Sequence, residues 1–347
     1  MNELYLIKIL ILSTLSFVLA FLLTPLLTHY LYKYKLGKSI RNTGATPIFS
    51  SLHEHKGGTP TMGGILIWFT TLILALLFFY LDYLFPDTGL GFLNFLTRPE
   101  TILPLSCLVA TALVGLVDDF IDIRSQGKGG LRMKHRLLIY TVIAAVGAYW
   151  FYFKLGWDIF HVPFVGDLFI GGWYIPIFIF VIVATAFSVN EIDGLDGLAG
   201  GTLLSAFAAF GAIALIQGKT NLAALCGVII GALLAFLWFN INPARFFMGD
   251  TGAMALGVTL GIVAMLTNQA LLLLVIGFLF VVESLSVILQ MLSKKLRHGK
   301  KIFLSSPIHH HFQALGWPET KIVMRFWVIS CVTSITGIII FLLDKGV

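Results

Sequence analysis

Small polar clusters interrupt an otherwise apolar chain, and their residue types suit the chemistry of cations and phosphates. Asp118 and Asp119 end one apolar run, Asp250 opens another in a Gly-Asp-Thr-Gly turn, and three adjacent histidines begin at His309. Carboxylates are the ligands that Mg²⁺ prefers, and basic groups attract phosphate. The combination predicts phosphoryl transfer, in which a protein mainly positions the reactants and neutralises their charge.

A further cluster consists of Asn190, Asp193 and Asp196, which follow one another at intervals of three residues. On a helix this spacing places the three side chains along one face for two turns. Gly194 and Gly197 lie between and beside them and allow another helix or a ligand to approach closely. Three aligned oxygen-bearing side chains can hold a divalent ion, a sugar or a base. The alternative interpretation is that Asn190 or Asp193 caps a helix.

Each of the other clusters also has a plainer interpretation. The Asp118-Asp119 pair could be a solvated helix end, although carboxylates at a membrane edge are costly unless they are paired, hydrated or bound to a cation. Asp250 could cap the helix that it opens. The histidines could form an adventitious metal site or a solvated loop. The run from Lys56 to Gly64 is rich in glycine and threonine, which is typical of backbone near a ligand and also of an ordinary entry into a helix.

The composition shows what must position these residues. Hydrophobic residues make up 58% of the chain and charged residues only 12%, whereas charged residues alone make up about a quarter of an ordinary soluble domain. We therefore predict an all-α integral membrane protein of one domain, 1–347, with a small exterior β-hairpin near 158–172. Ten apolar segments approach the length of a bilayer crossing: 4–32, 62–85, 101–121, 137–153, 173–190, 198–216, 222–239, 251–266, 269–292 and 322–343.

The distribution of Lys and Arg predicts the orientation in the membrane. If the N-terminus is outside, 18 of the 23 basic residues fall on the inner side, which is the side that carries the excess in membrane proteins. Both termini are then exterior (periplasmic), and every polar cluster named above lies on the cytoplasmic face. A basic face also suits anionic membrane lipids and a polyanionic substrate.

In order and spacing, several segments resemble the phospho-N-acetylmuramoyl-pentapeptide transferase family, a branch of the polyprenyl-phosphate N-acetylhexosamine 1-phosphate transferases. These segments are Lys56 to Gly64, Asp118-Asp119, Asn190 to Gly197, Asn240 to Asp250 and Pro307 to Phe312. The resemblance implies a multi-pass enzyme of the bacterial inner membrane. Such an enzyme transfers the phospho-sugar-peptide from UDP-N-acetylmuramoyl-pentapeptide to undecaprenyl phosphate, which gives lipid I and UMP. The resemblance also implies Mg²⁺ as cofactor, a homodimer and no nucleic-acid partner.

The resemblance further implies a role for each matched residue. Asp250 is the expected magnesium ligand, with Asp118 as the second candidate, and Asp118, Asp119 and Asp250 are the expected catalytic residues. The expected substrate-binding residues are Lys56, Thr61, Lys134, Asn190, Asp193, Asp196, Asn240, Phe247, His309, His310 and His311. Phe247 is expected to stack on uracil, and the histidines to face the sugar-pentapeptide.

The chain departs from the family pattern at three places. Asp122 stands where members often have a lysine, so that a basic contact there would come from Lys128 or Lys134. The sequence Glu191-Ile192 replaces the usual Leu-Thr, and the segment from Arg41 to Lys56 is longer than is typical.

Two alternatives to this function remain open from the sequence. One keeps the reaction but uses UDP-N-acetylglucosamine as the sugar donor. The other is a secondary transporter, since intramembrane acids also mark ion pathways. The clustering of polar residues at one membrane face, with no inverted repeat in the sequence, is contrary to the transporter.

Overall fold

The fold is a bundle of long apolar helices in the computed structural model, which describes residues 3–37, 56–125 and 130–346. The principal helices are α1 (Glu3–Lys33), α3 (Ile65–Leu84), α4 (Ile102–Arg124), α5 (Met133–Tyr149), α6 (Tyr174–Ile192), α7 (Leu198–Ile216), α8 (Thr220–Asn240), α9 (Asp250–Leu266), α10 (Leu273–Ile276), α11 (Phe278–Leu296), α12 (Ile308–Ala314) and α13 (Glu319–Asp344). The shorter elements are η2 (Pro86–Thr88), η3 (Leu90–Leu93), η4 (Trp150–Lys154), β1 (Ile159–Val162), β2 (Gly166–Phe169), η5 (Gly171–Trp173) and η6 (Ala270–Leu272).

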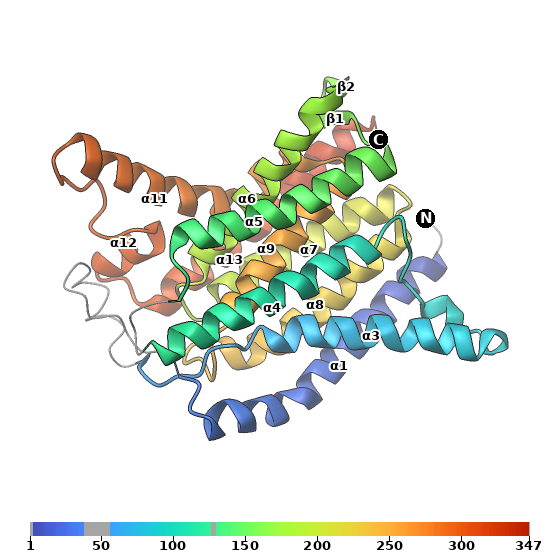
Figure 1. Ribbon diagram of the computed structural model, residues 1–347, viewed down its shortest axis with the longest axis horizontal. Helices are drawn as coiled ribbons and strands as arrows, with labels where there is room; N and C mark the ends of the chain where they lie inside the picture. Colours follow the sequence, from blue (N-terminus) through green and yellow to red (C-terminus); the bar gives the residue numbers. More distant parts are fainter. Residues whose placement is uncertain (1–2, 38–55, 126–129, 347) are drawn as a thin grey trace.

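The membrane-protein prediction is confirmed by the lengths and composition of these helices. Within the described ranges, eight helices are long and apolar enough to cross a membrane, and a bent pair makes a ninth candidate. The ten predicted apolar segments all coincide with helical segments, and the one predicted at 251–266 corresponds to the shorter helix α9. Figure 1 shows that the two chain ends and the hairpin lie at one end of the bundle, while α12 lies at the other.

Helix α9 forms the centre of the bundle. Every residue from Thr251 to Leu266 is buried, and α3, α4, α6 and α7 all pack against it. A helix that is apolar on all sides is stable only when other helices or lipid surround it. This central position places the first residue of α9, Asp250, among the ends of the surrounding helices.

Helices α10 and α11 replace the single span predicted for 269–292. The helical segments on either side of Gly277 are bent by 83° relative to each other, and α11 leaves the bundle toward α12 (Figure 1). The inner face of α11 is polar. Its Gln290 accepts the backbone N–H groups of Ile302 and Phe303 at 3.0 and 3.1 Å and donates to the carbonyl of Phe303 at 2.8 Å. These bonds fix the connection that leads to the histidines.

The predicted hairpin is confirmed at the opposite end of the bundle. Its two strands pair antiparallel, with Ile159 opposite Phe169. His161 joins the hairpin to the end of α13, since its ring nitrogens lie 2.7 Å from Asp167 and 2.6 Å from Asp344. Burial alone would lower the pKa of His161, but the two carboxylates outweigh it and raise the pKa above its ordinary value.

Candidate active site

The guanidinium of Arg136 lies between two of the predicted catalytic aspartates. Its Nε is 2.8 Å from Asp118 of α4, and its Nη2 is 2.6 Å from Asp250 at the start of α9. Asn190 of α6 completes the group, because its amide donates to Asp250 at 2.5 Å while its oxygen accepts from Arg136 at 3.0 Å. Four helices therefore bring one cation, two carboxylates and an amide into direct contact.

Asp118 is held from a second direction by the loop that precedes α5. Its side chain is completely buried, and its Oδ1 accepts the backbone N–H of Leu131. The backbone at Gly130 lies so close that a Cβ there would be 2.0 Å from the same oxygen. The position of the Asp118 carboxylate is thus determined by the loop on one side and Arg136 on the other.

Asp119 has a different role from its neighbour, although both were expected to be catalytic. Its two oxygens accept the backbone N–H groups of Asp250 and Thr251, each at 3.0 Å, and Thr61 donates to it at 3.4 Å. Gly249 has a φ of +75°, and a Cβ there would lie 2.6 Å from Asp119. Asp119, a residue of α4, therefore caps the N-terminus of α9. From the sequence, this capping role was the alternative interpretation of Asp250.

A second group of charges surrounds Lys56. Its Nζ lies 2.7 Å from Asp196 and 2.6 Å from Glu319, the first residue of α13. Glu319 also accepts the backbone N–H of Asp196 at 2.6 Å. The other oxygen of Asp196 accepts the amide of Asn242 at 3.0 Å and the backbone N–H of Ala244 at 3.1 Å. All three charged side chains are largely buried, with between 4% and 11% of their surface exposed.

The prediction that Asn190, Asp193 and Asp196 share one helix face is wrong. Helix α6 ends at Ile192, and Asp193 occupies its C-cap. Gly197, with a φ of +81°, then begins the turn into α7. A left-handed backbone of this kind favours glycine and ends regular helix. Asn190 consequently faces Asp250, whereas Asp196 belongs to the Lys56 group.

Asn240 and Phe247 border the Lys56 group. Asn240 is buried and joins two turns, since its oxygen accepts the backbone N–H of Gly197 at 2.9 Å and its amide donates to the carbonyl of Phe246 at 2.8 Å. Phe247 is half-buried, and the Lys56 ammonium lies 5.9 Å from its ring centre. Asn240 therefore supports the site, while Phe247 presents an aromatic ring beside a cation.

His309 is completely buried between α11 and the turn after α6. Its Nδ1 lies 3.0 Å from Glu283, a buried acid of α11. On the other side, a Cβ at Gly194 would be 2.3 Å from Nε2 of His309. Burial, together with the charge of Lys56, lowers the pKa of His309 to about 3. The ring is therefore neutral at physiological pH and packs as part of the protein interior.

The other two histidines have separate partners. His310 is also buried, and its Nδ1 lies 2.7 Å from the side-chain oxygen of Gln313. His311 is half-buried and accepts the backbone N–H of Leu304 at 3.2 Å. The triplet therefore does not point at one common atom, which is contrary to a metal site built from three imidazoles.

Comparison with known proteins identifies the family. The family described as Glycosyl transferase family 4 matches residues 101–268. The phospho-N-acetylmuramoyl-pentapeptide-transferase of Chloroflexus aurantiacus is 38% identical over 345 residues, which are 95% of this chain and 89% of that protein. Proteins of the same name from Geobacillus and Listeria monocytogenes are each 38% identical over 328 residues, covering 94% and 93% of this chain and 95% and 96% of theirs. The chain belongs to the phospho-N-acetylmuramoyl-pentapeptide-transferase family. The resemblance inferred from the motifs is thereby confirmed.

The structure also shows which basic residue contacts the aspartates in this chain. Asp122 stands where members often carry a lysine, and the sequence suggested Lys128 or Lys134 as a replacement. Lys134 is exposed, Lys128 lies outside the described residues, and Arg136 makes the contacts. The buried face of α5 includes Tyr140, Ala144 and Gly147. Arg136 lies on the same face by helical spacing, and this spacing is the sequence signal that could have identified Arg136 as a site residue.

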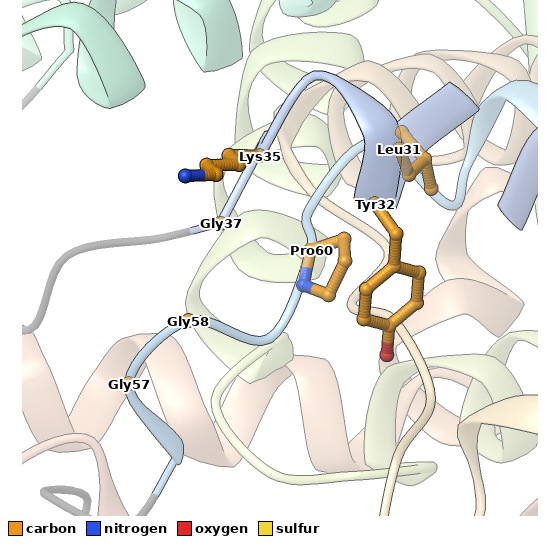
Figure 2. A pocket seen from close by; sticks show the side chains of 7 residues that line it. All are labelled: Leu31, Tyr32, Lys35, Gly37, Gly57, Gly58 and Pro60. Atoms are coloured by element: carbon orange, nitrogen blue, oxygen red, sulfur yellow. The ribbon is translucent and has the colours of Figure 1, made fainter. Parts of the chain in front are cut away.

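A shallow pocket opens beside the glycine-rich run of the family. Its volume is about 370 Å³, and Figure 2 shows Pro60 between the side chains of Lys35 and Tyr32. The other lining residues are Leu31, Gly37, Gly57 and Gly58. The close approach of the two backbone segments requires glycine, because a Cβ at Gly37 would lie 2.7 Å from the carbonyl oxygen of Gly58.

Proposed function

We propose that the protein transfers phospho-N-acetylmuramoyl-pentapeptide, the group that the name of its relatives gives, from its UDP derivative to undecaprenyl phosphate. An oxygen of the lipid phosphate attacks the phosphorus bound to the sugar. The bond between that phosphorus and the oxygen shared with UMP breaks, so that lipid I forms and UMP leaves. The observation that carries the proposal is the convergence of Asp118 and Asp250 on one cation, in a chain 38% identical to these transferases over 95% of its length.

We propose Mg²⁺ as the cofactor, held by Asp250 and Asp118. The two carboxylates already face the same positive group, Arg136, and carboxylate oxygens are the donors that Mg²⁺ prefers. Within the described parts of the chain, no three His, Cys, Asp or Glu side chains could together hold a metal ion. Mg²⁺ typically binds through one or two carboxylates plus substrate phosphates. When bound, it would neutralise charge on the reacting phosphates.

The protein's own residues then have mainly positioning roles. Asp119 holds the start of α9, and thus Asp250, in place. A phosphate monoester has a second pKa near 6, so much of the lipid phosphate is already dianionic at neutral pH without a strong base. Asp118 therefore organises charge. Phe247 offers a ring on which a uracil could stack beside Lys56, and α12 carries the residues proposed to contact the sugar-pentapeptide.

The polar groups of the candidate active site lie near one end of the bundle, and we propose that this end faces the cytoplasm. The excess of Lys and Arg in the connections at that end supports this orientation. The same orientation gives the UDP-linked substrate access from the cytosol. Assembly as a homodimer remains a prediction from the family resemblance, and sedimentation of the purified protein in detergent would test it.

One assay tests the proposed reaction. Purified protein in detergent, supplied with undecaprenyl phosphate and Mg²⁺, should release UMP from UDP-N-acetylmuramoyl-pentapeptide and not from UDP-N-acetylglucosamine. The variant Asp250→Asn should lose more activity than the roughly 10–100-fold that is typical when a residue supporting a metal ligand is removed. Release of UMP only from UDP-N-acetylglucosamine would favour the alternative sugar, and no release from either donor would contradict the transferase.

A further inference from the structure

Arg136 contacts the same carboxylate oxygens, of Asp118 and Asp250, that would bind the metal ion. Both oxygens of Asp250 are engaged, because Oδ2 lies 2.6 Å from Nη2 of Arg136, and Oδ1 accepts from Nη1 at 3.2 Å and from Asn190 at 2.5 Å. Oδ2 of Asp118 lies 2.8 Å from Nε of the same guanidinium. The arginine fork therefore spans the two carboxylates proposed to hold magnesium.

A guanidinium and a divalent cation on the same carboxylate oxygens oppose each other through their positive charges. Mg²⁺ binds carboxylate oxygen at about 2.1 Å and demands near-octahedral geometry. A guanidinium held against the same oxygen would lie within a few ångströms of the metal, where two positive charges in a partly buried site repel strongly. The side chain of Arg136 is only 13% exposed, so that water screens little of this repulsion.

Removal of the guanidinium would in turn leave two acids facing each other. Asp118 is completely buried and Asp250 is 13% exposed. Two like charges in such a site destabilise the ends of α4 and α9 unless a cation replaces the one that is lost. Arg136 is thus the internal counter-ion that keeps the site assembled when no metal is bound.

We propose that Arg136 and the divalent cation compete for Asp118 and Asp250, so that metal binding displaces the guanidinium from Asp250. This inference rests on the magnesium site proposed above. By thermodynamic linkage, a change that weakens the contact between Arg136 and the carboxylates strengthens metal binding. Arg136 is therefore a positioning residue that sets metal affinity, and its contribution to metal binding is unfavourable.

Metal binding without substrate tests the competition directly. Purified protein in detergent is titrated with Mn²⁺ alone, and free Mn²⁺ is measured by electron paramagnetic resonance. The variant Arg136→Gln should bind Mn²⁺ at least about fivefold more tightly than the parent, the lower end of typical coupling between sites. Arg136→Lys should bind with intermediate affinity, because a lysine keeps the charge but loses the fork that spans both acids. The matched control is Arg132→Gln, which removes an exposed charge one turn earlier and should leave the affinity unchanged.

Thermal unfolding provides a second measurement that a general folding defect would not imitate. Without metal, Arg136→Gln should unfold at a lower temperature than the parent, and Mn²⁺ should raise its midpoint by more than it raises the parent's. Affinity for Mn²⁺ in Arg136→Gln equal to or below the parent value would overturn the inference, while UMP release by the parent with Mg²⁺ would leave the proposed function standing. Absence of Mn²⁺ binding in both the parent and Arg136→Gln would likewise overturn the inference.

Discussion

Asp119 caps the helix that Asp250 opens, since its carboxylate accepts the backbone N–H of Asp250 at 3.0 Å. Two aspartates adjacent in sequence therefore have different structural roles. Asp118 contacts the guanidinium of Arg136. Asp119 holds the N-terminal end of α9, which carries Asp250. The distinction leads to different expectations for substitutions at the two positions.

The capping role predicts a loss of stability when Asp119 is shortened. Asp119→Ala should lower the free energy of unfolding by about 1–2 kcal/mol, the upper range for a lost cap, because two backbone N–H groups lose their acceptor. Asp119→Asn keeps one oxygen acceptor and should lose less. Thermal unfolding of the purified protein in detergent measures both. The control is Asp87→Ala, an exposed acid in η2, and equal midpoints for Asp119→Ala and this control would contradict the role.

The Lys56 group predicts a larger loss, which a second substitution should partly reverse. Lys56→Met leaves Asp196 and Glu319 as buried, unbalanced acids, and removal of one partner from such a group costs about 3 kcal/mol. The double variant Lys56→Met with Glu319→Gln removes one of the two acids and should be more stable than the single variant. Unfolding midpoints of the four proteins in the cycle give the coupling between the two residues. Independent, additive effects would show that the contact contributes nothing.

Burial of His309 predicts a dependence of stability on acid. The pKa of His309 in the folded protein is about 3, below the ordinary value of 6.5, so that the unfolded chain binds a proton at pH values where the folded protein does not. The stabilising contribution is therefore fully present above about pH 6.5 and is lost as the pH falls toward 3. Between pH 7.5 and 5, the unfolding midpoint of the parent should fall more steeply than that of His309→Asn. Parallel slopes would indicate that His309 does not titrate in this way.

The packing of Gly194 against His309 predicts an effect on substrate recognition. Gly194→Ala places a Cβ 2.3 Å from Nε2 of His309 and must displace α12, because the buried ring cannot move aside. If α12 contacts the sugar-pentapeptide, the KM for the UDP-sugar-peptide should rise several-fold, while the KM for undecaprenyl phosphate changes little. Gly172→Ala, where nothing lies within 4 Å of the added carbon, is the matched control. A proportional rise in both KM values would point instead to a general distortion of the site.

The helical architecture could be predicted from the sequence because apolar length alone determines it. The segment predicted at 198–216 coincides with α7, and the turn around Gly166 was visible as a hairpin. The break at Gly277 could not be predicted, since the apolar run continues through it and only packing in three dimensions bends it.

The sequence predicted most of the residue types in the candidate site, but not which side chains contact one another. The aspartates and Lys56 stood out as charges at the edges of apolar runs. Arg136 did not, because a basic residue near the inner end of a helix is also explained by membrane orientation. Glu319 precedes the apolar segment predicted at 322–343, and only the tertiary fold shows that it contacts Lys56. The helical alignment predicted for Asp193 and Asp196 failed because the chain turns at Gly197.

The contact between Lys56 and Glu319 joins residues 263 positions apart in the chain. During synthesis, a nascent chain that has reached residue 300 already contains Lys56, Asp196 and all the aspartates of the centre, yet it lacks the segment that supplies Glu319. The ammonium then has one carboxylate partner instead of two, and the turn at Asp196 lacks the acceptor for its backbone N–H. Completion of the Lys56 group therefore depends on α13, the last helix to be made.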